Sequence, residues 1–426
     1  MHHFHDRPGP PGLELWCEEV PLSRIADAVG TPVYVYASAT LAHHYAVFVR
    51  AFAPRDVSVA YAVKANSSLA VLATLARLGA GADTVSEGEI RRALAAGVPA
   101  SRIVFSGVGK TDAELAFALD AGVSEINLES ELELHRLAAI AADKGVRATV
   151  ALRVNPDVGA GGHAKITTGS DENKFGVSAS EVERLYARAC ALPQFDVAGL
   201  ACHIGSQITE FAPLRAAFAA MRTLVERLRA GGLPVRRLDL GGGLGVPYGD
   251  APPPPTPADY ARAVLDTVGD LEVELAFEPG RLIVANAGVL LSRVIQVHTR
   301  PSGRRFLVLD AAMNDLLRPA LYDAHHAIRP VRTPEPGAVE RPYDVVGPVC
   351  ETGDTFARDR RLPDLAAGDL VALMTAGAYG ASMSSEYNSR PLVPEVLVKG
   401  ADYAVTRPRP SYEEMLGRER RAPWLG

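Results

Sequence analysis

A lysine stands at the end of a short apolar run, and its amine could form a covalent bond. Lys64 follows Val57-Ser-Val-Ala-Tyr-Ala-Val63, whose length and valine content are typical of a buried strand. Burial favours the neutral form of an amine, and the neutral amine is the nucleophile that builds a Schiff base. A lysine at a strand end is more often a solvated charge, so this interpretation depends on the rest of the chain.

A run of glycines suggests an anion site. Gly241-Gly-Gly-Leu-Gly245 follows the expected strand Arg237-Leu-Asp-Leu240. Such glycines let backbone amides close on an anion, most simply a phosphate. The spacing does not fit the dinucleotide fingerprint, and the lysine of a P-loop is missing from the motif. The run therefore favours a single phosphate on a small cofactor over ATP or NAD, with a tight turn as the alternative.

Two more polar residues end expected strands. Glu278, in Glu278-Pro-Gly-Arg281, could be a general base, or could keep a pyridine nitrogen protonated so that the ring becomes an electron sink. His203, in Cys202-His-Ile-Gly-Ser206, could stack on a ring or be structural, and it lacks neighbours at metal-site spacing. A Schiff-base lysine, a phosphate cradle, an imidazole and this carboxylate together indicate pyridoxal 5′-phosphate (PLP).

These residues belong to a repeated unit of strand, polar end and helix. Short β-rich runs occur at 57–63, 80–85, 102–106, 125–128, 147–154, 196–203, 236–240 and 273–277. Four helix starts carry the capping-box pattern, a Ser or Thr three residues before a Glu: Ser86, Thr111, Ser130 and Ser178. The alternation predicts a parallel sheet, and eight units favour a closed (β/α)8 TIM-like barrel over an open doubly wound sheet.

Such a barrel has its active site at the carboxyl ends of its strands. The polar residues that follow the expected strands are Lys64, Asp83, Ser106, Glu129, Arg153, Asn155, His203, Ser206, Gly241 to Gly243, Glu278 and Arg281. Loops begin at strand ends, which explains some of these residues but not all of them.

The pattern changes after Arg281. Runs at 288–298, 305–310, 343–346, 369–375, 392–398 and 402–406 predict strands without long helices between them, and therefore a C-terminal all-β domain. Thr31-Pro-Val-Tyr-Val-Tyr36 predicts one more strand, which could join that sheet. The predicted organisation is an N-terminal segment that joins the β domain (1–38), a PLP-binding barrel (39–284) and the C-terminal β domain (285–426).

Bulk properties exclude several classes of protein. The chain has 426 residues and a net charge of −6 without long runs of one sign, which does not point to nucleic acid or to an anionic membrane. Its 4 cysteines lie far apart, which fits a reducing, cytoplasmic location and argues against a thiolate metal site. No stretch is apolar enough to span a bilayer, and Met1-His-His-Phe-His-Asp-Arg7 is expected to be a flexible start rather than a signal peptide.

The chain resembles the diaminopimelate decarboxylases, a family of alanine-racemase-like (fold type III) PLP enzymes. The resemblance covers nearly the whole chain. In the barrel it rests on Tyr61-Ala-Val-Lys-Ala-Asn66, Gly81-Ala-Asp-Thr-Val-Ser86, His163-Ala-Lys-Ile-Thr-Thr-Gly169, Asn173-Lys-Phe-Gly176, His203-Ile-Gly-Ser206, the glycine run and Glu278-Pro-Gly-Arg281. Beyond the barrel it rests on the more discriminating motifs Met313-Asn-Asp-Leu-Leu-Arg-Pro-Ala-Leu-Tyr322, Gly347-Pro-Val-Cys-Glu351, Gly377-Ala-Tyr-Gly380 and Tyr387-Asn-Ser-Arg-Pro391.

The resemblance implies decarboxylation of meso-2,6-diaminopimelate to L-lysine and carbon dioxide, the last step of lysine biosynthesis. It implies that Lys64 forms the Schiff base and that Cys350 protonates the product carbon, as a thiol can near neutral pH. The implied cofactor-binding residues are Lys64, Asp83, His203, Ser206, Gly241, Gly242, Gly243, Glu278, Gly280, Arg281 and Tyr379. Cys350 and Glu351 are expected to reach the active site of a partner subunit, which implies a homodimer with shared sites.

Diaminopimelate carries an amino-acid group at each end, so an enzyme that acts at one end must hold the other. Arginine offers a planar fork for the remote carboxylate, and Glu351 offers an anion for the remote ammonium. The implied substrate-binding residues are Arg281, Arg318, Tyr322, Glu351 and Tyr379. The alternatives are a decarboxylase of the same fold for ornithine, arginine, carboxynorspermidine or a carrier-linked amino acid, an amino-acid racemase, and a non-catalytic PLP carrier or regulatory homologue.

Overall fold

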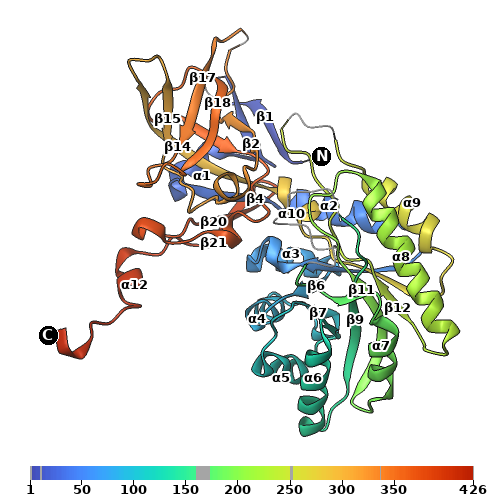
Figure 1. Cartoon of the computed structure of the whole chain (residues 1–426). Helices are drawn as coiled ribbons and strands as arrows, with labels where there is room; N and C mark the ends of the chain where they lie inside the picture. Colours follow the sequence, from blue (N-terminus) through green and yellow to red (C-terminus); the bar gives the residue numbers. More distant parts are fainter. Residues whose placement is uncertain (1, 10–11, 160–172, 250–252, 336, 426) are drawn as a thin grey trace. The chain divides into compact units, whose positions relative to one another are not determined.

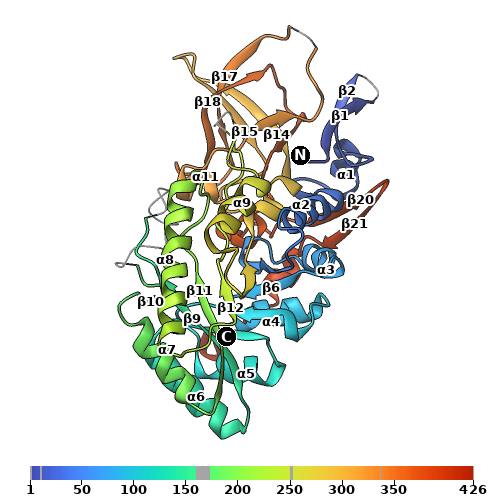
Figure 2. The same cartoon turned by 90° about the vertical axis from the view of Figure 1, so that its right-hand side faces the viewer.

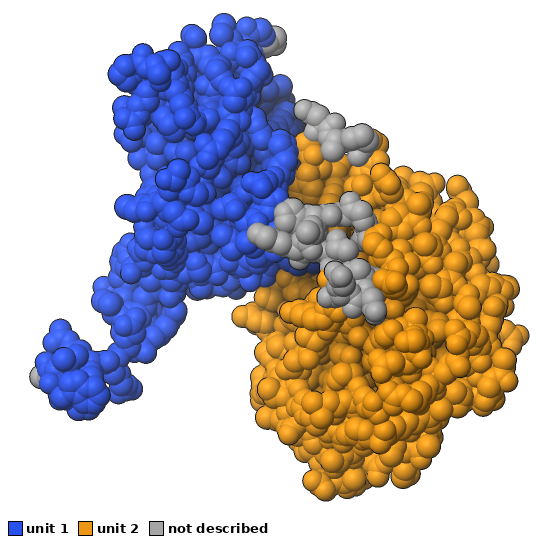
Figure 3. Space-filling model, viewed as in Figure 1, with its two compact units in different colours: residues 1–40, 284–426 blue, residues 41–283 orange. Residues whose placement is uncertain are grey.

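The computed structural model describes residues 2–9, 12–159, 173–249, 253–335 and 337–425, so the motif His163–Gly169 lies outside the described residues. It divides into two compact units, coloured separately in Figure 3. One unit combines Met1–Thr40 with Val284–Gly426, and the other is Leu41–Ile283. The predicted boundaries, after residues 38 and 284, fall beside these breaks.

Parallel strands form a closed barrel at the centre of the Leu41–Ile283 unit. Within the described residues, hydrogen bonds join eight strands in the cyclic order β5, β6, β7, β8, β9, β11, β12, β13, with β10 (Val177–Ser178) added beside β9. The barrel strands are β5 (Val57–Ala62), β6 (Gly81–Thr84), β7 (Ile103–Phe105), β8 (Glu125–Leu128), β9 (Ala148–Asn155), β11 (Phe195–Cys202), β12 (Arg237–Asp239) and β13 (Glu274–Phe277). The predicted barrel is confirmed, and each predicted run matches its strand to within one residue at either end.

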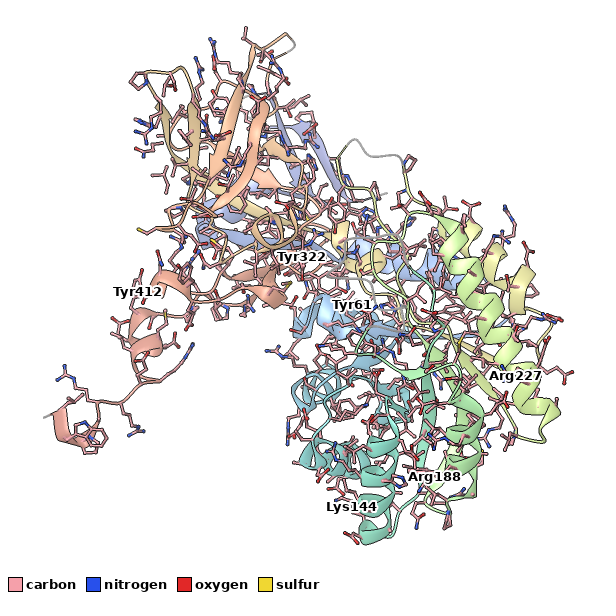
Figure 4. All side chains as sticks on the ribbon, viewed as in Figure 1. Tyr61, Lys144, Arg188, Arg227, Tyr322 and Tyr412 are labelled. Atoms are coloured by element: carbon pink, nitrogen blue, oxygen red, sulfur yellow. The ribbon has the colours of Figure 1, made fainter. Side chains whose placement is uncertain are left out.

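Helices surround these strands, as Figures 1 and 2 show from two directions. They are α3 (Leu69–Arg77), α4 (Glu87–Ala95), α5 (Asp112–Ala121), α6 (Glu131–Lys144), α7 (Val182–Ala191), α8 (Phe211–Ala230) and α9 (Pro257–Val268). Two more helices, α2 (Ser38–Arg50) and α10 (Arg281–Val284), include the breaks between the units. Lys144, Arg188 and Arg227 mark the outer faces of α6, α7 and α8 in Figure 4.

Side-chain caps begin most of the predicted helices. Ser86, Thr111 and Ser130 each accept a hydrogen bond from the backbone N–H three residues later, as the capping pattern predicts. The prediction at Ser178 is wrong, because Val177 and Ser178 form β10 and helix α7 starts at Val182 without a side-chain cap. Pairing with β9 therefore outweighs the local capping signal.

The other unit is mostly β. Its main sheet has the order β18, β17, β15, β14, β4, β20, β21, and β19 joins β14 to β16. The strands are β4 (Val33–Ala37), β14 (Gly288–Thr299), β15 (Arg305–Leu309), β16 (Ile328–Pro330), β17 (Glu340–Val346), β18 (Thr355–Pro363), β19 (Leu370–Leu373), β20 (Glu395–Lys399) and β21 (Asp402–Arg407). Two short helices, α11 (Arg318–Tyr322) and α12 (Tyr412–Leu416), complete it. The predicted all-β character and the joining of β4 are confirmed, whereas the sequence pattern does not predict β16 and β18.

The N-terminal residues are ordered against the β unit, which corrects the expected flexible start. They form β1 (Phe4–Pro8), β2 (Leu13–Cys17), β3 (Val20–Pro21) and helix α1 (Leu22–Val29). Phe4 pairs with Cys17, and both side chains are buried in the hydrophobic core of the unit. Burial of these apolar side chains stabilises a hairpin whose outer residues are polar.

The described residues contain neither a membrane-spanning helix nor a cluster of metal ligands. No helix in the described ranges combines the length and the apolar character needed to cross a membrane. In the same ranges, His, Cys, Asp and Glu side chains do not gather in threes or more in a way that could hold a metal ion.

Candidate active site

Lys64 lies in a short 3-10 turn (Val63–Ala65) directly after β5. Its Nζ donates to Oδ2 of Asp83 on β6 at 2.6 Å, and the side chain of Asp83 is fully buried while that of Lys64 is 38% exposed. The pairing of Ala62 with Asp83 in the sheet sets this geometry. An adjacent carboxylate favours the ammonium form of an amine, and the neutral amine expected from the sequence stays a prediction.

Glu278 follows β13 and is an unusual acid. Its Oε1 is buried and finds no hydrogen-bond partner in the described part of the chain. Burial raises the pKa of Glu278 well above its usual value, and the nearby carboxylates Asp239 and Asp83 raise it further. Glu278 therefore holds a proton more tightly than an exposed glutamate does, and its unpaired oxygen suits a group that exchanges a proton with it.

His203 follows β11 and is neutral. The N–H of Gly242 donates to Nδ1 of His203 at 3.2 Å, which makes Nδ1 an acceptor. Burial lowers the pKa of His203 to about 3, and the charges of Lys64 and Arg153 lower it further. A neutral flat ring held in this way can lie against another aromatic ring without adding positive charge.

The glycine run passes where side chains have no room. A Cβ on Gly241 would meet the carbonyl of Cys202, and a Cβ on Gly242 would meet the carbonyl of Glu278. Gly241 and Gly243 also have φ angles of 66° and 106°, which L side chains disfavour. Only glycine lets this loop lie so close to the ends of the neighbouring strands.

Two amides of the run are engaged within the protein. The N–H of Gly241 donates to Oδ1 of Asp239 at 2.7 Å, and the N–H of Gly242 donates to His203. The expectation that the amides of this run close on an anion stays a prediction, and in this structure two of them are bonded within the protein. The run shapes a cradle, and the charge that attracts an anion comes from elsewhere.

Arg281 and Ser206 supply that charge and a hydroxyl. Nη2 of Arg281 donates to the Ser206 hydroxyl at 2.9 Å, and Nη1 donates to the Tyr248 hydroxyl at 3.0 Å. Gly205, which precedes Ser206, packs its carbonyl against Gly243 of the glycine run. A buried guanidinium beside a hydroxyl and a glycine cradle suits a phosphate. Gly280, just before this arginine, packs against the side chain of Ala62, 3.0 Å from where its own Cβ would lie.

Arg153 and Glu129 form a second buried ion pair at the strand ends. Nη1 of Arg153 donates to Oε1 of Glu129 at 2.7 Å, and Oε2 of Glu129 accepts from the N–H of Gly176 at 2.9 Å. The guanidinium also lies 4.8 Å from the centroid of the Phe175 ring. This pair ties residues 175–176 to the barrel and places a cation among the ends of the strands.

The C-terminal motifs converge within the β unit. Three hydrogen bonds join stretches that are far apart in sequence: Met313 N–H to Asp354 Oδ1 (2.7 Å), Asn314 Nδ2 to Ser385 O (2.9 Å) and Cys350 N–H to Asn388 Oδ1 (3.2 Å). These hydrogen bonds link the segments around three of the discriminating motifs, Met313–Tyr322, Gly347–Glu351 and Tyr387–Pro391.

Arg318 begins helix α11 and is buried. Its Nη1 lies 2.9 Å from Nε2 of His326, whose Nδ1 lies 2.9 Å from the carbonyl oxygen of Met374. Because a carbonyl can only accept, Nδ1 carries the ring proton and Nε2 accepts from Arg318. A neutral histidine thus orients the guanidinium without cancelling its charge.

Cys350 and Glu351 lie in an exposed loop of the β unit. Asp354 holds the loop by accepting the N–H of Val349 at 2.7 Å, and the Tyr387 hydroxyl donates to Glu351. This loop joins two of the family motifs, which the sequence separates by more than thirty residues.

Tyr322 and Tyr379 are both half-buried in the β unit, and Figure 4 labels Tyr322 at the end of α11. Tyr379 has a left-handed backbone, with φ of 55°, which costs about 1–2 kcal/mol for a residue with a side chain. Such a conformation is kept where the surrounding structure dictates the direction of a side chain.

The residues of the barrel fit PLP on the structure alone. Lys64 offers a strand-end amine, Glu278 offers an unpaired buried oxygen, and Gly241 to Gly243 leave a cradle that Cβ atoms would fill. Arg281 with Ser206 provides the cation and hydroxyl that a phosphate needs. The set matches an aldehyde, a ring nitrogen and a phosphate on one small molecule.

Three residues of these two clusters do not stand out from the sequence. Asp239 lies two residues from Arg237, on the same face of an otherwise apolar strand, so the period of two could have revealed it. Tyr248 lies in a loop of Pro and Gly, and His326 follows another histidine, and neither position has a periodic signal.

Comparison with known proteins agrees with this chemistry. The family model described as "Pyridoxal-dependent decarboxylase, pyridoxal binding domain" matches residues 38–285. The diaminopimelate decarboxylases of Pseudomonas aeruginosa and Zymomonas mobilis are 50% and 48% identical, over 96% of this chain and 98% of theirs. The diaminopimelate decarboxylase structure from Helicobacter pylori, complexed with L-lysine, has a TM-score of 0.89 at 39% identity and covers 93% of this chain and 98% of that one.

A more distant structure shows how far the fold extends. The lysine/ornithine decarboxylase of Vibrio vulnificus, complexed with putrescine, covers 89% of this chain and 97% of its own, with a TM-score of 0.77 at 24% identity. At that identity the likeness concerns the fold alone. The near-full-length relatives decide the matter: this chain belongs to the diaminopimelate decarboxylase family of PLP-dependent carboxy-lyases.

Proposed function

We propose that the protein decarboxylates meso-2,6-diaminopimelate to L-lysine and carbon dioxide with PLP, the last step of lysine biosynthesis. The observation that carries this proposal is the barrel mouth, where Lys64, paired with Asp83, shares one end of the barrel with Glu278, whose Oε1 is buried without a partner among the described residues. A cofactor with both an aldehyde and a basic ring nitrogen would use both groups.

The substrate is supported by the relatives rather than by the barrel. Curated relatives at about 50% identity are named diaminopimelate decarboxylases, and the Helicobacter pylori structure is a complex with L-lysine. L-lysine is what remains when diaminopimelate loses one carboxyl group. The cluster of C-terminal motifs, with Arg318, Tyr322 and Glu351, supplies the charges that the second amino-acid group of this substrate requires.

When bound, PLP supplies a protonated ring that accepts the electron pair of the breaking carbon–carbon bond. Lys64 is proposed to hold the cofactor through Nζ, with Asp83 keeping that amine in place. Glu278 is proposed to keep the ring nitrogen protonated. A carboxyl group with a raised pKa is a stronger base than an ordinary glutamate, so it shares a proton with the weakly basic ring nitrogen more readily. Arg281 and Ser206 are proposed to bind the phosphate, and His203 to lie against the ring.

In the β unit, Cys350 is proposed to deliver the proton that replaces the lost carboxyl group. Arg318 is proposed to bind the remote carboxylate and Glu351 the remote ammonium, with Tyr322 and Tyr379 as hydroxyl donors. The contact with His326 supports this role for Arg318, because it holds the guanidinium in a fixed orientation within the β unit.

We also propose that the active protein is a homodimer in which Cys350 and Glu351 serve the site of the partner subunit. Both residues are exposed in the single chain, whereas a proton donor to carbon works best where water is excluded. Large apolar side chains at the C-terminal end, Tyr412, Leu416 and Trp424, are also exposed, as expected of a surface that a second subunit covers. A cytoplasmic location is proposed from the 4 free cysteines.

The direct test of the function is to supply purified protein and PLP with meso-diaminopimelate and to measure L-lysine and carbon dioxide. Equal amounts of the two products are expected, and kcat/KM should exceed that for ornithine or L-lysine as substrate by at least about 1000-fold, because those amines lack the remote carboxylate that the proposed site binds. Equal turnover of ornithine would assign the protein to a related decarboxylase instead.

Cys350→Ala should lower kcat on diaminopimelate by about 100-fold and leave the dissociation constant of PLP unchanged, because the change removes a proton donor but no cofactor contact. Steady-state kinetics and a spectral titration measure the two effects. Cys190→Ala, on helix α7, is the matched control and should behave as the unmodified protein. Full activity of Cys350→Ala would discard the proposed donor.

The same variant tests the shared site. Mixing subunits of Cys350→Ala with subunits of Lys64→Ala should restore about a quarter of the native activity, because half of the random dimers are mixed and each has one intact site. No recovery after subunit exchange would place Cys350 in the site of its own subunit.

Arg318→Lys should raise KM for diaminopimelate by about tenfold, since lysine keeps the charge but loses the planar fork. Arg300→Lys, in an exposed turn of the same unit, is the control. The melting temperature distinguishes a loss of substrate binding from a loss of packing against His326. The proposal requires KM to rise in a variant whose melting temperature stays within a few degrees of that of the native protein. An unchanged KM would place Arg318 outside the substrate site.

A further inference from the structure

Charged side chains occupy the interior of the barrel, where branched apolar residues are usual. The charged groups that interact there are four carboxylates and three cations, namely Asp83, Glu125, Asp239, Glu278, Lys64, Arg153 and Arg237. The proposed function uses Lys64, Asp83 and Glu278. It leaves Asp239, one of the most deeply buried of these carboxylates, without a role.

Asp239 faces the inside of the barrel. It is the last residue of β12, yet it interacts electrostatically with Asp83 on β6 and Arg153 on β9, which are not neighbours of β12. In the sheet Asp239 pairs with Ala276 of β13, and Glu278 comes two residues after Ala276, just beyond the end of that strand. The two carboxyl groups interact electrostatically, which places both in the same interior at the ends of adjacent strands.

The two oxygens of Asp239 have different surroundings. Oδ1 accepts the N–H of Gly241 at 2.7 Å and so fixes the start of the glycine run. Oδ2 is buried and has no hydrogen-bond partner among the described residues, and the same holds for Oε1 of Glu278. The residue as a whole is 1% exposed. Two carboxyl groups therefore each keep an unpaired buried oxygen in one interior, an arrangement that a purely structural pair would avoid.

We propose that Asp239 is a positioning residue whose buried negative charge makes Glu278 hold its proton, and the proton of the cofactor ring nitrogen beside it, more tightly. This inference rests on the proposed function, since it assigns Asp239 to the same site. Asp239 touches neither cofactor nor substrate in this account and acts only through Glu278 and Gly241.

The direction of the effect follows from the charges. Burial raises the pKa of Asp239 to about 6, and the charge of Asp239 is the largest cause after burial of the raised pKa of Glu278. A nearby negative charge makes any proton on Glu278 or on a ring nitrogen harder to lose. Above the pKa of Asp239 this charge is present, so the proton survives to higher pH. If the charge of Asp239 is removed, the proton on Glu278 or on the ring nitrogen must be lost at lower pH.

Other groups around Asp239 modulate this effect without reversing it. Arg237 and Arg153 favour its ionised form, whereas Asp83 opposes it. The remaining ionisable groups that face Asp239 are Glu125 on β8, Cys202 on β11, Glu278 beyond β13 and Tyr260 on α9. Asp239 therefore interacts with cations and anions on several strands of the barrel.

Asp239→Asn tests the proposal, because the amide oxygen can still accept from Gly241 while the charge is removed. The protein is loaded with PLP labelled with ¹⁵N, and the ring-nitrogen chemical shift is followed against pH by NMR. In Asp239→Asn the loss of the ring proton should move to lower pH by about one unit, and the alkaline limb of kcat should move with it. Asp196→Asn, an exposed aspartate paired with Arg236 on the barrel, is the control and should titrate as the native protein does.

Two results would overturn the proposal. One is a ring-nitrogen titration in Asp239→Asn that is unchanged from the native protein. If Asp239→Asn does not fold, Asp239→Ser replaces it, because it also removes the charge and its hydroxyl can still accept from Gly241. The transition should again move to lower pH, and no shift or a shift to higher pH overturns the proposal. The readout is independent of turnover, so it stands even if diaminopimelate proves not to be the substrate.

Discussion

The ion pair between Lys64 and Asp83 is the contact on which the proposed chemistry depends. Nζ of Lys64 and Oδ2 of Asp83 lie 2.6 Å apart, and the side chain of Asp83 on β6 is fully buried. Its place is set by the register of β5 and β6, so the amine is held by the barrel rather than by a loop. The side chain of Lys64 remains partly exposed, which leaves Nζ accessible to a ligand at the barrel mouth. A closed parallel barrel thus provides both a fixed anchor and an open approach.

The barrel also contains charged side chains in its interior. Buried charges cost free energy unless they are paired, and here pairs such as Lys64 with Asp83 and Arg153 with Glu129 meet that condition. For the carboxyl groups in excess, Glu278 among them, burial and neighbouring negative charges raise the pKa. The same physics that limits the stability of the barrel therefore prepares an acid for a ring nitrogen, and functional sites are where such local conflicts are expected.

Strand positions and strand ends could be predicted from the sequence because both follow from local patterns. The apolar runs located all eight barrel strands, and the residues after them included Lys64, His203 and Glu278. The failures lie where distant contacts decide the outcome. Ser178 pairs with β9 instead of capping a helix, and the N-terminal residues pair as β1 and β2 and pack into the core of the β unit instead of forming a flexible start. No pattern of single residues contains such partners.

The most direct test of the account is to find where the cofactor is attached. Protein loaded with PLP would be treated with borohydride, digested and mapped by mass spectrometry. The account predicts one reduced pyridoxyl phosphate group per chain, on Nζ of Lys64. A fully loaded protein whose label lies on another lysine, or on none, would contradict it.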